Sequence, residues 1–195
     1  MFDTLIKTLD NSNSDIRAQA REQLVRMNAD VVDALILAMQ SGNYRIAWQA
    51  AVTLGEIPDS RWVAPMTAAM RSPNILLAQA AVTALENMLQ KDATVRFLEA
   101  LPHTKLVVQM SLVNSLERLQ DETAVQPLCR LLESSDNPEL IYCIIQALGK
   151  LGDSSVIPLI EKFQDHGNHH VRERVTIALD RLAINPHDNL SSDLG

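Results

Sequence analysis

The chain has 195 residues, of which 47% are hydrophobic and only 4% aromatic, and its formal net charge is −7. This length fits one domain or one continuous array, and the apolar share excludes wholesale disorder. The 6 glycines and 8 prolines are too few for an all-β fold with many tight turns, and the acidic balance disfavours general nucleic-acid binding.

An internal repeat runs through the sequence, and its helices can be followed in chain order. The first helix of each repeat, helix A, is marked by two apolar residues four positions apart, which share one face of an α-helix. These pairs begin at Leu5, Leu35, Met66, Phe97, Leu128 and Leu159. Prolines 65, 127 and 158 fall near the start of helix A, where a missing N–H costs little.

The second helix, helix B, is marked by anchor leucines that recur every 30 to 32 residues. They are Leu24, Leu54, Leu85, Leu116, Leu148 and Leu179. Apolar residues also stand eight and four positions before each anchor and three after it, and these positions share one helical face at ~100° per residue. The segments between helices A and B are rich in Asn, Ser, Gly, Pro and Asp, which cap helices or accept turn geometry. Asp59, Asp121 and Asp153, five residues after an anchor, are expected to cap the following helix A.

This pattern predicts an all-α fold, a right-handed α-solenoid (superhelix) of six two-helix repeats. One helix pair cannot bury its own apolar face, so neighbouring pairs must stack. Charged residues on helix B of the first and last repeats, such as Arg17 and Arg172, fit terminal repeats with a neighbour on one side only. We expect one solenoid domain over residues 1–186 and a frayed polar tail at 187–195. The expected repeat bounds are 1–30, 31–62, 63–92, 93–124, 125–156 and 157–186.

Four stretches carry a shared motif: LGKLGDSSVIPLIEKF (148–163), NHHVRERVTIALDRL (168–182), SDIRAQAREQL (14–24) and AVTLGEIPDS (51–60). They resemble the HEAT-repeat family, and most closely its short subtype found in phycobilisome lyases and many bacterial adaptors. The resemblance covers residues 1–186, and it implies a fold rather than one function. Repeats three and four depart most, because ENMLQKD and ERLQDET lack the usual glycine after the anchor leucine.

The face of helix B opposite the buried stripe is the predicted partner-binding surface, which in a solenoid of this type is concave. Positions two and six residues before each anchor point away from the stripe. They include a tryptophan and a tyrosine, which are enriched at interaction hot spots. In the alternative, the curvature of the array buries this row against flanking loops. The predicted contact residues are Trp48, Val52, Gln79, Met110, Tyr142 and Gln146, with Glu173 and Arg45 as a polar rim.

Enzymatic signals are weak in this sequence. His166, His169 and His170 have no cysteine nearby and one adjacent carboxylate, Asp165, so a solvated loop is favoured over a metal site. Neither a nucleophile elbow nor a phosphate-binding glycine loop occurs. We therefore predict no catalytic residue, no metal and no resident cofactor.

The compartment is predicted from equally simple features. No apolar run approaches the ~18 residues of a membrane helix, and the N-terminal stretch mixes acidic with basic residues. Cys129 and Cys143 are too few for a disulfide framework, so both are expected to be free thiols. We expect a cytoplasmic protein without membrane insertion.

Three functions remain open at this point. The first is a non-enzymatic scaffold or adaptor that binds a protein partner on its helix-B surface. The resemblance implies a second, a phycobilisome-lyase-like bilin chaperone or lyase subunit with a tetrapyrrole as ligand, and this leaves enzymatic activity open. The third, a DNA-binding HEAT-like solenoid, is disfavoured because the predicted concave row holds no Lys or Arg.

Overall fold

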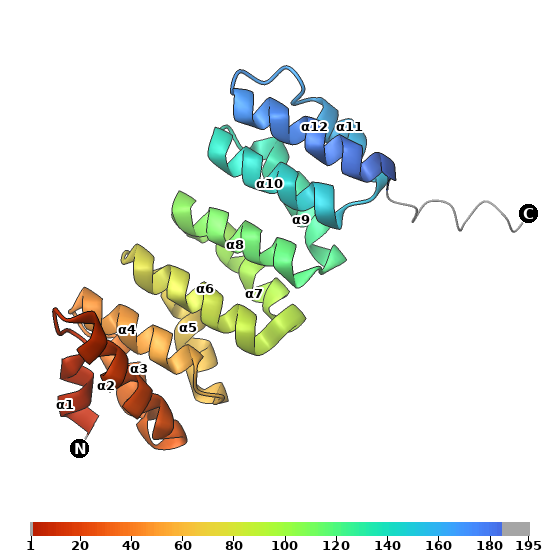
Figure 1. The fold of residues 1–195 in the computed structure, drawn as a ribbon. Coiled ribbons are helices and arrows are strands. Elements are labelled where there is room, and N and C mark those ends of the chain that lie inside the picture. Colours follow the sequence, from red (N-terminus) through yellow and green to blue (C-terminus); the bar gives the residue numbers. More distant parts are fainter. Residues whose placement is uncertain (1, 185–195) are drawn as a thin grey trace, which may run out of the picture. The chain divides into compact units, whose positions relative to one another are not determined.

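A computed structural model describes residues 2–184, and over this range the chain is built from six pairs of α-helices and no strand (Figure 1). The A helices are α1 (Phe2–Thr8), α3 (Val32–Met39), α5 (Val63–Ala69), α7 (Ala93–Ala100), α9 (Val125–Ser134) and α11 (Ile157–Glu161). The B helices are α2 (Ser14–Arg26), α4 (Tyr44–Gly55), α6 (Ile75–Leu89), α8 (Leu106–Leu119), α10 (Pro138–Leu151) and α12 (His169–Ile184). The six predicted repeats are therefore present as six helix pairs.

A short 3₁₀ turn leads into five of the six A helices of the described chain. These turns are η1 (Asn28–Val31), η2 (Ser60–Trp62), η3 (Gln90–Asp92), η5 (Glu122–Ala124) and η6 (Ser154–Val156), while η4 (Leu101–His103) follows α7. The predicted capping aspartates stand directly before three of them. Asp59, Asp121 and Asp153 each accept a hydrogen bond from the backbone N–H two residues later, with N···O distances of 2.9, 3.0 and 2.8 Å. The capping prediction is confirmed, with the 3₁₀ turn as the first part of the capped segment.

Asparagines cap the B helices at one repeat position, eleven residues before the anchor leucine. In each case the side-chain Oδ1 accepts hydrogen bonds from N–H groups of the first helical turn. The capping residues are Asn13, Asn43, Asn74, Asn137 and Asn168. In the fourth repeat Lys105 stands at this position instead.

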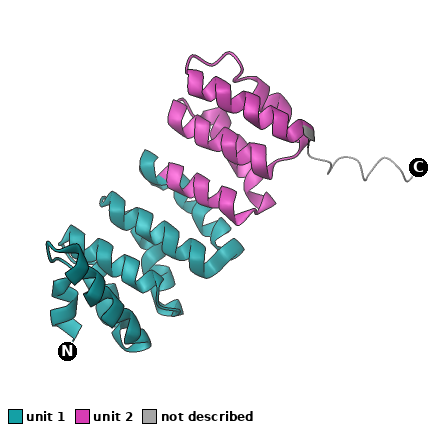
Figure 2. Cartoon of the chain, in the orientation of Figure 1, with its two compact units in different colours: residues 1–108 teal, residues 109–195 magenta. Residues whose placement is uncertain are grey.

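The described part of the chain forms two compact units that divide after residue 108, and they are coloured separately in Figure 2. In the first unit α4 packs along α6, and α3 and α5 pack against them. In the second unit α10 packs along α12, with α9 and α11 against them. The prediction of a single domain over 1–186 stays a prediction, and the predicted tail at 187–195 lies outside the described residues.

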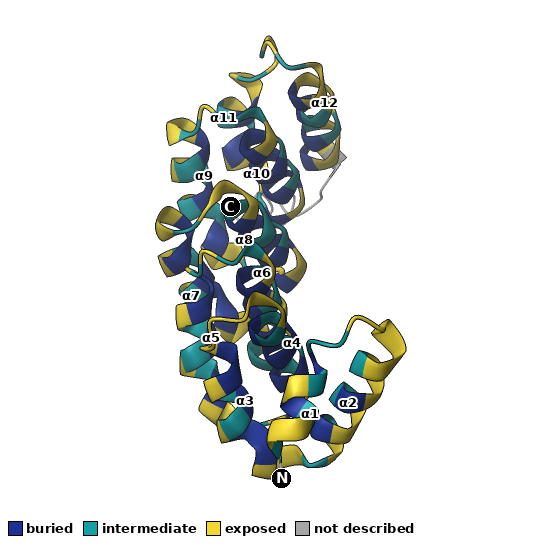
Figure 3. Cartoon of the chain, turned by 90° about the vertical axis from the view of Figure 1, so that its left-hand side faces the viewer, coloured by how far each residue is buried: buried dark blue, intermediate teal, exposed yellow. Residues whose placement is uncertain are grey.

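The core follows the apolar stripe of the repeat. Five anchor leucines, Leu24, Leu54, Leu85, Leu116 and Leu148, have no exposed surface. The sixth, Leu179, is half-buried, and Ile16 is 39% exposed although the pattern assigns it to the stripe. These two residues lie on α12 and α2, each of which has a neighbouring B helix on one side only within the described chain. Figure 3 shows exposed positions along α2.

Candidate functional site

In the first unit the predicted residues Trp48 and Val52 lie on α4, in line with Tyr44 one turn earlier. The helix begins at Tyr44 because Asn43 Oδ1 accepts hydrogen bonds from the N–H groups of Arg45 and Ile46, at 3.0 and 3.1 Å. Trp48 and Val52 are half-buried, whereas Tyr44 is 67% exposed. The row therefore presents its apolar surface most openly at the start of α4.

Two hollows meet at Trp48. The first, which we call the Trp48 groove, has a volume of about 400 Å³ and is lined by residues of α4 and α6 that include Trp48, Val52, Leu76, Gln79 and Ala80. The second, the arginine hollow, has a volume of about 570 Å³ and is lined by Ser12, Arg17, Tyr44, Arg45, Asn74 and the two residues it shares with the groove, Trp48 and Leu76. The shared residues show that the two hollows adjoin.

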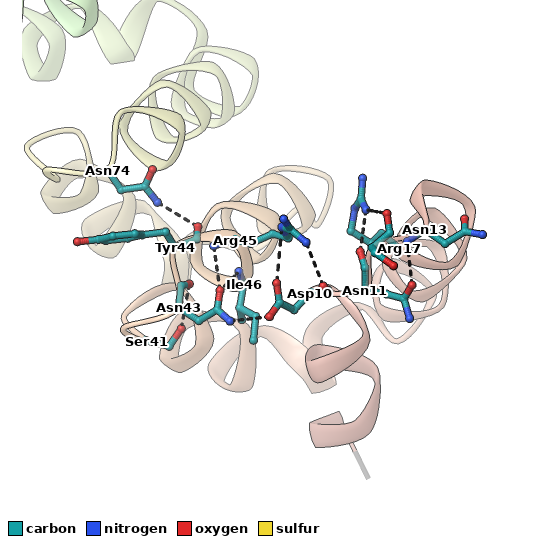
Figure 4. A network of polar contacts seen from close by, with 11 residues as sticks. Asp10, Asn11, Asn13, Arg17, Ser41, Asn43, Tyr44, Arg45, Ile46 and Asn74 are labelled. Atoms are coloured by element: carbon teal, nitrogen blue, oxygen red, sulfur yellow. Dashed lines mark hydrogen bonds and ion pairs between the residues drawn. The ribbon is translucent and has the colours of Figure 1, made fainter.

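The arginine hollow carries positive charge. Arg45 Nη1 donates to the backbone oxygen of Asp10 at 3.2 Å, and its Nε lies 3.6 Å from the Asp10 carboxylate (Figure 4). Arg17 Nη1 donates to the backbone oxygens of Asn11 and Ser12, at 2.7 and 3.0 Å. None of the described lining residues of the hollow is acidic. Backbone oxygens carry no formal charge, so they hold the Arg17 guanidinium in place without neutralising it.

In the second unit the predicted residues Tyr142 and Gln146 lie one turn apart on α10. Both are half-buried. The guanidinium of Arg174, from α12, lies over the ring of Tyr142, with Cζ 4.4 Å from the ring centroid, and also donates to the tyrosine hydroxyl. This is a cation–π contact, so one face of the Tyr142 ring is already covered within the chain.

Gln146 belongs to a buried polar contact. Its Nε2 donates to Oε2 of Glu117 on α8 at 2.7 Å, and Lys150 on α10 forms an ion pair with the other oxygen, Oε1. Glu117 is only 7% exposed, and a buried carboxylate needs such donors to offset the loss of water. The sequence reasoning missed Glu117, Lys150 and Arg174. The available signal was that Glu117 occupies the position where repeats two and five have glycine.

The predicted contact residues are divided between the two units. Arg45, Trp48, Val52 and Gln79 lie in the first unit, and the hollows bring these four around one surface. Met110, Tyr142, Gln146 and Glu173 lie in the second. Met110 is half-buried, and Glu173 is exposed with its carboxylate 4.0 Å from His170 Nδ1. Their roles in partner binding stay predictions.

The thiols are poorly suited to nucleophilic chemistry. Burial raises the pKa of Cys129 and of Cys143 above the ordinary thiol value, and the nearby carboxylates of Glu133 and Glu117 raise them further. A raised pKa leaves little thiolate near neutral pH, and the thiolate is the nucleophile. Among residues 2–184, no cluster of three or more His, Cys, Asp or Glu side chains is arranged to hold a metal ion. None of the helices in that range combines the length and apolar character that crossing a membrane requires.

Comparison with protein families decides the family. A model described as HEAT repeats matches residues 2–86 and 63–143, which together span most of the chain. The chain belongs to the HEAT-repeat family. The HEAT-repeat assignment agrees with the paired helices and confirms the predicted all-α solenoid class.

Several relatives of this HEAT-repeat chain are known. The uncharacterized phycocyanin operon protein Z of Pseudanabaena tenuis (strain PCC 7409) is 24% identical, and the match covers 94% of this chain and 96% of that protein. A chain from the complex of CpcE and CpcF of phycocyanin lyase from Nostoc sp. PCC7120 is 24% identical, with a TM-score of 0.62 over 80% of this chain. The match spans 66% of that lyase chain, just under two thirds of its length. A computationally designed armadillo repeat protein for modular peptide recognition is 14% identical, with a TM-score of 0.54 over 93% of this chain and 99% of that one.

Proposed function

We propose that this HEAT-repeat chain is a non-enzymatic adaptor that binds a protein partner on its B helices, with the Trp48 groove as the principal contact. The observation that carries the proposal is the position of Trp48, where two adjoining hollows meet. The exposed side chains of Tyr44 and Leu76 flank it. A tryptophan at the centre of a concave surface can bury a large apolar area on binding while its indole N–H finds a polar partner.

The solved relatives support this class of function. The lyase chain from Nostoc was solved in a complex of two proteins, CpcE and CpcF. The designed armadillo repeat protein is described as made for peptide recognition. Both are similar in fold to this chain, and repeat arrays offer extended surfaces that can bind other polypeptides. We expect this chain to act in the cytoplasm.

The test is affinity capture from a lysate of the source organism with the full chain, read by mass spectrometry. Trp48→Ala is expected to weaken binding of the captured partner about thirtyfold, the cost of removing a central hot-spot side chain. Combining it with Tyr142→Ala should abolish capture. Leu37→Ala is the matched control, because Leu37 is an apolar residue on helix α3 that is 70% exposed. Equal capture by the folded Trp48→Ala variant would contradict the proposal.

A second function is favoured by the two phycocyanin relatives, namely a bilin chaperone or a lyase subunit. One relative is described as a phycocyanin operon protein, and the other is a chain from the complex of CpcE and CpcF of phycocyanin lyase. A tetrapyrrole has an extended apolar body and acidic side chains, which the Trp48 groove and the arginine hollow would complement. Titrating phycocyanobilin into the full chain should then shift the pigment absorbance and quench the tryptophan fluorescence, to which Trp48 contributes. The absence of both changes would contradict this second function.

A further inference from the structure

We infer that the arginine hollow and the Trp48 groove together bind a short acidic segment of a partner protein, with its carboxylates at Arg17 and Arg45 and its apolar side chains over Trp48. The inference rests on the proposed adaptor function and specifies the chemistry of the partner. The expected ligand is a polypeptide segment with acidic residues next to apolar ones.

The charge of the surface is the first step. The hollow is lined by two arginines, and none of its described lining residues is acidic. Arg17 is held by uncharged backbone oxygens, whereas the charge of Arg45 is partly offset by the Asp10 carboxylate, 3.6 Å from its Nε. This local positive charge lies in a chain with a net charge of −7. A broadly acidic partner surface would be repelled by the rest of the chain, so a short acidic segment fits best.

The second step is the apolar side. Trp48 and Leu76 line both hollows, and Leu76 is 53% exposed. Val52 and Ala80 continue the apolar lining along the groove. One carboxylate, Glu56, lines the groove, and it forms an ion pair with Arg21, whose Nε lies 3.2 Å away. The surface therefore changes from cationic to aromatic to apolar, and the complementary segment changes from acidic to apolar.

The third step is preorganisation of the cationic end. Asn43 Nδ2 donates to the Asp10 carboxylate at 2.8 Å, and Asn74 Nδ2 donates to the backbone oxygen of Tyr44 at 3.0 Å (Figure 4). These bonds join three successive repeats around the hollow. Asp10 in turn positions Arg45. Because the rim is ordered before the partner arrives, less conformational entropy is lost on binding.

Guanidinium groups also favour this ligand by geometry. An arginine offers a planar set of N–H donors that matches a carboxylate with two parallel hydrogen bonds. Arg17 uses Nη1 for both of its backbone contacts. A basic segment would be repelled by the same arginines. The charge of the hollow therefore favours an acidic segment over a basic one.

The experiment is a selection of short random peptides, displayed on phage, against the immobilised full chain at low salt. The enriched peptides are then synthesised, and their Kd is measured by fluorescence anisotropy. We expect Asp and Glu next to aromatic or aliphatic residues, and we expect binding to weaken as salt screens the charges. Arg17→Gln and Arg45→Gln should each weaken binding about fivefold. Arg71→Gln, which removes an exposed charge elsewhere in the first unit, is the matched control and should have no effect.

The variants separate the inference from the proposed function. Thermal melting confirms first that each variant is folded. If Trp48→Ala abolishes peptide binding but neither arginine variant weakens it, the inference of an acidic segment is overturned and the adaptor function still stands. If Trp48→Ala binds the peptides as tightly as the parent chain does, both the inference and the proposed function are overturned. A third outcome also overturns the inference. In it no peptide is enriched, phycocyanobilin binds the full chain, and the arginine variants weaken that binding, so the ligand is a carboxylated pigment.

Discussion

In repeats two, four and five, the residue directly after the anchor leucine lies at the contact between two neighbouring B helices. Repeats two and five have glycine there, and an added Cβ would lie 2.8 Å from Ala84 Cβ at Gly55 and 2.7 Å from Ala178 Cβ at Gly149. In repeat four the same position holds Glu117, whose buried carboxylate takes hydrogen bonds from α10 instead. A single repeat position thus supports either close backbone packing or a buried polar contact.

Gly149→Ala is expected to lower the free energy of unfolding by about 1–3 kcal/mol, because α10 and α12 must separate to admit the methyl group. Urea denaturation measures the change. Gly42→Ala is the control, since a Cβ there meets nothing within 4 Å. Adding Ala178→Gly to Gly149→Ala should recover part of the loss. A Gly149→Ala chain as stable as the parent would show that the close approach is not required.

The ion pair of Lys150 with Glu117 leads to a second prediction about stability. Lys150→Met leaves a buried carboxylate with one donor fewer, which we expect to cost about 1–2 kcal/mol, because Lys150 is itself partly exposed and the pair partly screened. Adding Glu117→Gln removes the uncompensated charge and should restore much of that loss. A double-mutant cycle by urea denaturation gives the coupling energy. Additive effects of the two changes would contradict the coupling.

The residue-scale contacts also show where sequence reasoning stops. The anchor leucines and the capping aspartates were predictable because the same residue type recurs in register. The contacts of Glu117 with Gln146 and of Arg174 with Tyr142 were not, since each occurs between one particular pair of helices and has no counterpart in the period. Trp48 was predictable as a surface residue, but the hollows on either side of it depend on the packing of α4 against α6 and on the position of α2.

At the scale of the element, two of the asparagine caps, Asn43 and Asn74, do more than form local hydrogen bonds. The cap amide also reaches the preceding repeat, from Asn43 to Asp10 and from Asn74 to Tyr44. Lys105 keeps this second contact, since its Nζ donates to the backbone oxygen of Pro73 at 3.0 Å. A lysine has no acceptor, however, so it cannot supply the capping bond at the start of α8.

Lys105→Asn is therefore expected to stabilise the chain by about 0.5–1 kcal/mol, the usual contribution of an N-cap. The asparagine Oδ1 can accept from the first turn of α8, while its Nδ2 replaces the lysine contact with the preceding repeat. Thermal melting followed by circular dichroism measures the gain. Asn74→Ala, which removes both contacts at the equivalent position, should lower stability by about 1 kcal/mol. A Lys105→Asn chain less stable than the parent would mean that the lysine contact outweighs the cap.

At the scale of the whole molecule, stability in a repeat array is approximately a sum over repeats and their neighbouring interfaces. The interface between α10 and α12 is one such term, since Gly149 packs against Ala178 there. Contacts in such arrays are mostly local in sequence, which also favours rapid folding. The two tryptophans, Trp48 and Trp62, both lie in the first unit, so their fluorescence reports that unit while circular dichroism reports all helices.

Removing repeat six, residues 157–195, tests this picture. The deletion uncovers the face of α10 that packs against α12, and we expect it to lower the free energy of unfolding of the second unit by at least about 2 kcal/mol, the contribution of one buried aliphatic side chain. The urea transition seen by circular dichroism should move to lower concentration, while the tryptophan transition moves less, because nearest-neighbour coupling weakens along the array. A chain ending at residue 184 is the control. Equal shifts of both transitions would mean that the chain unfolds as one cooperative block, and the summation over repeats would then not apply.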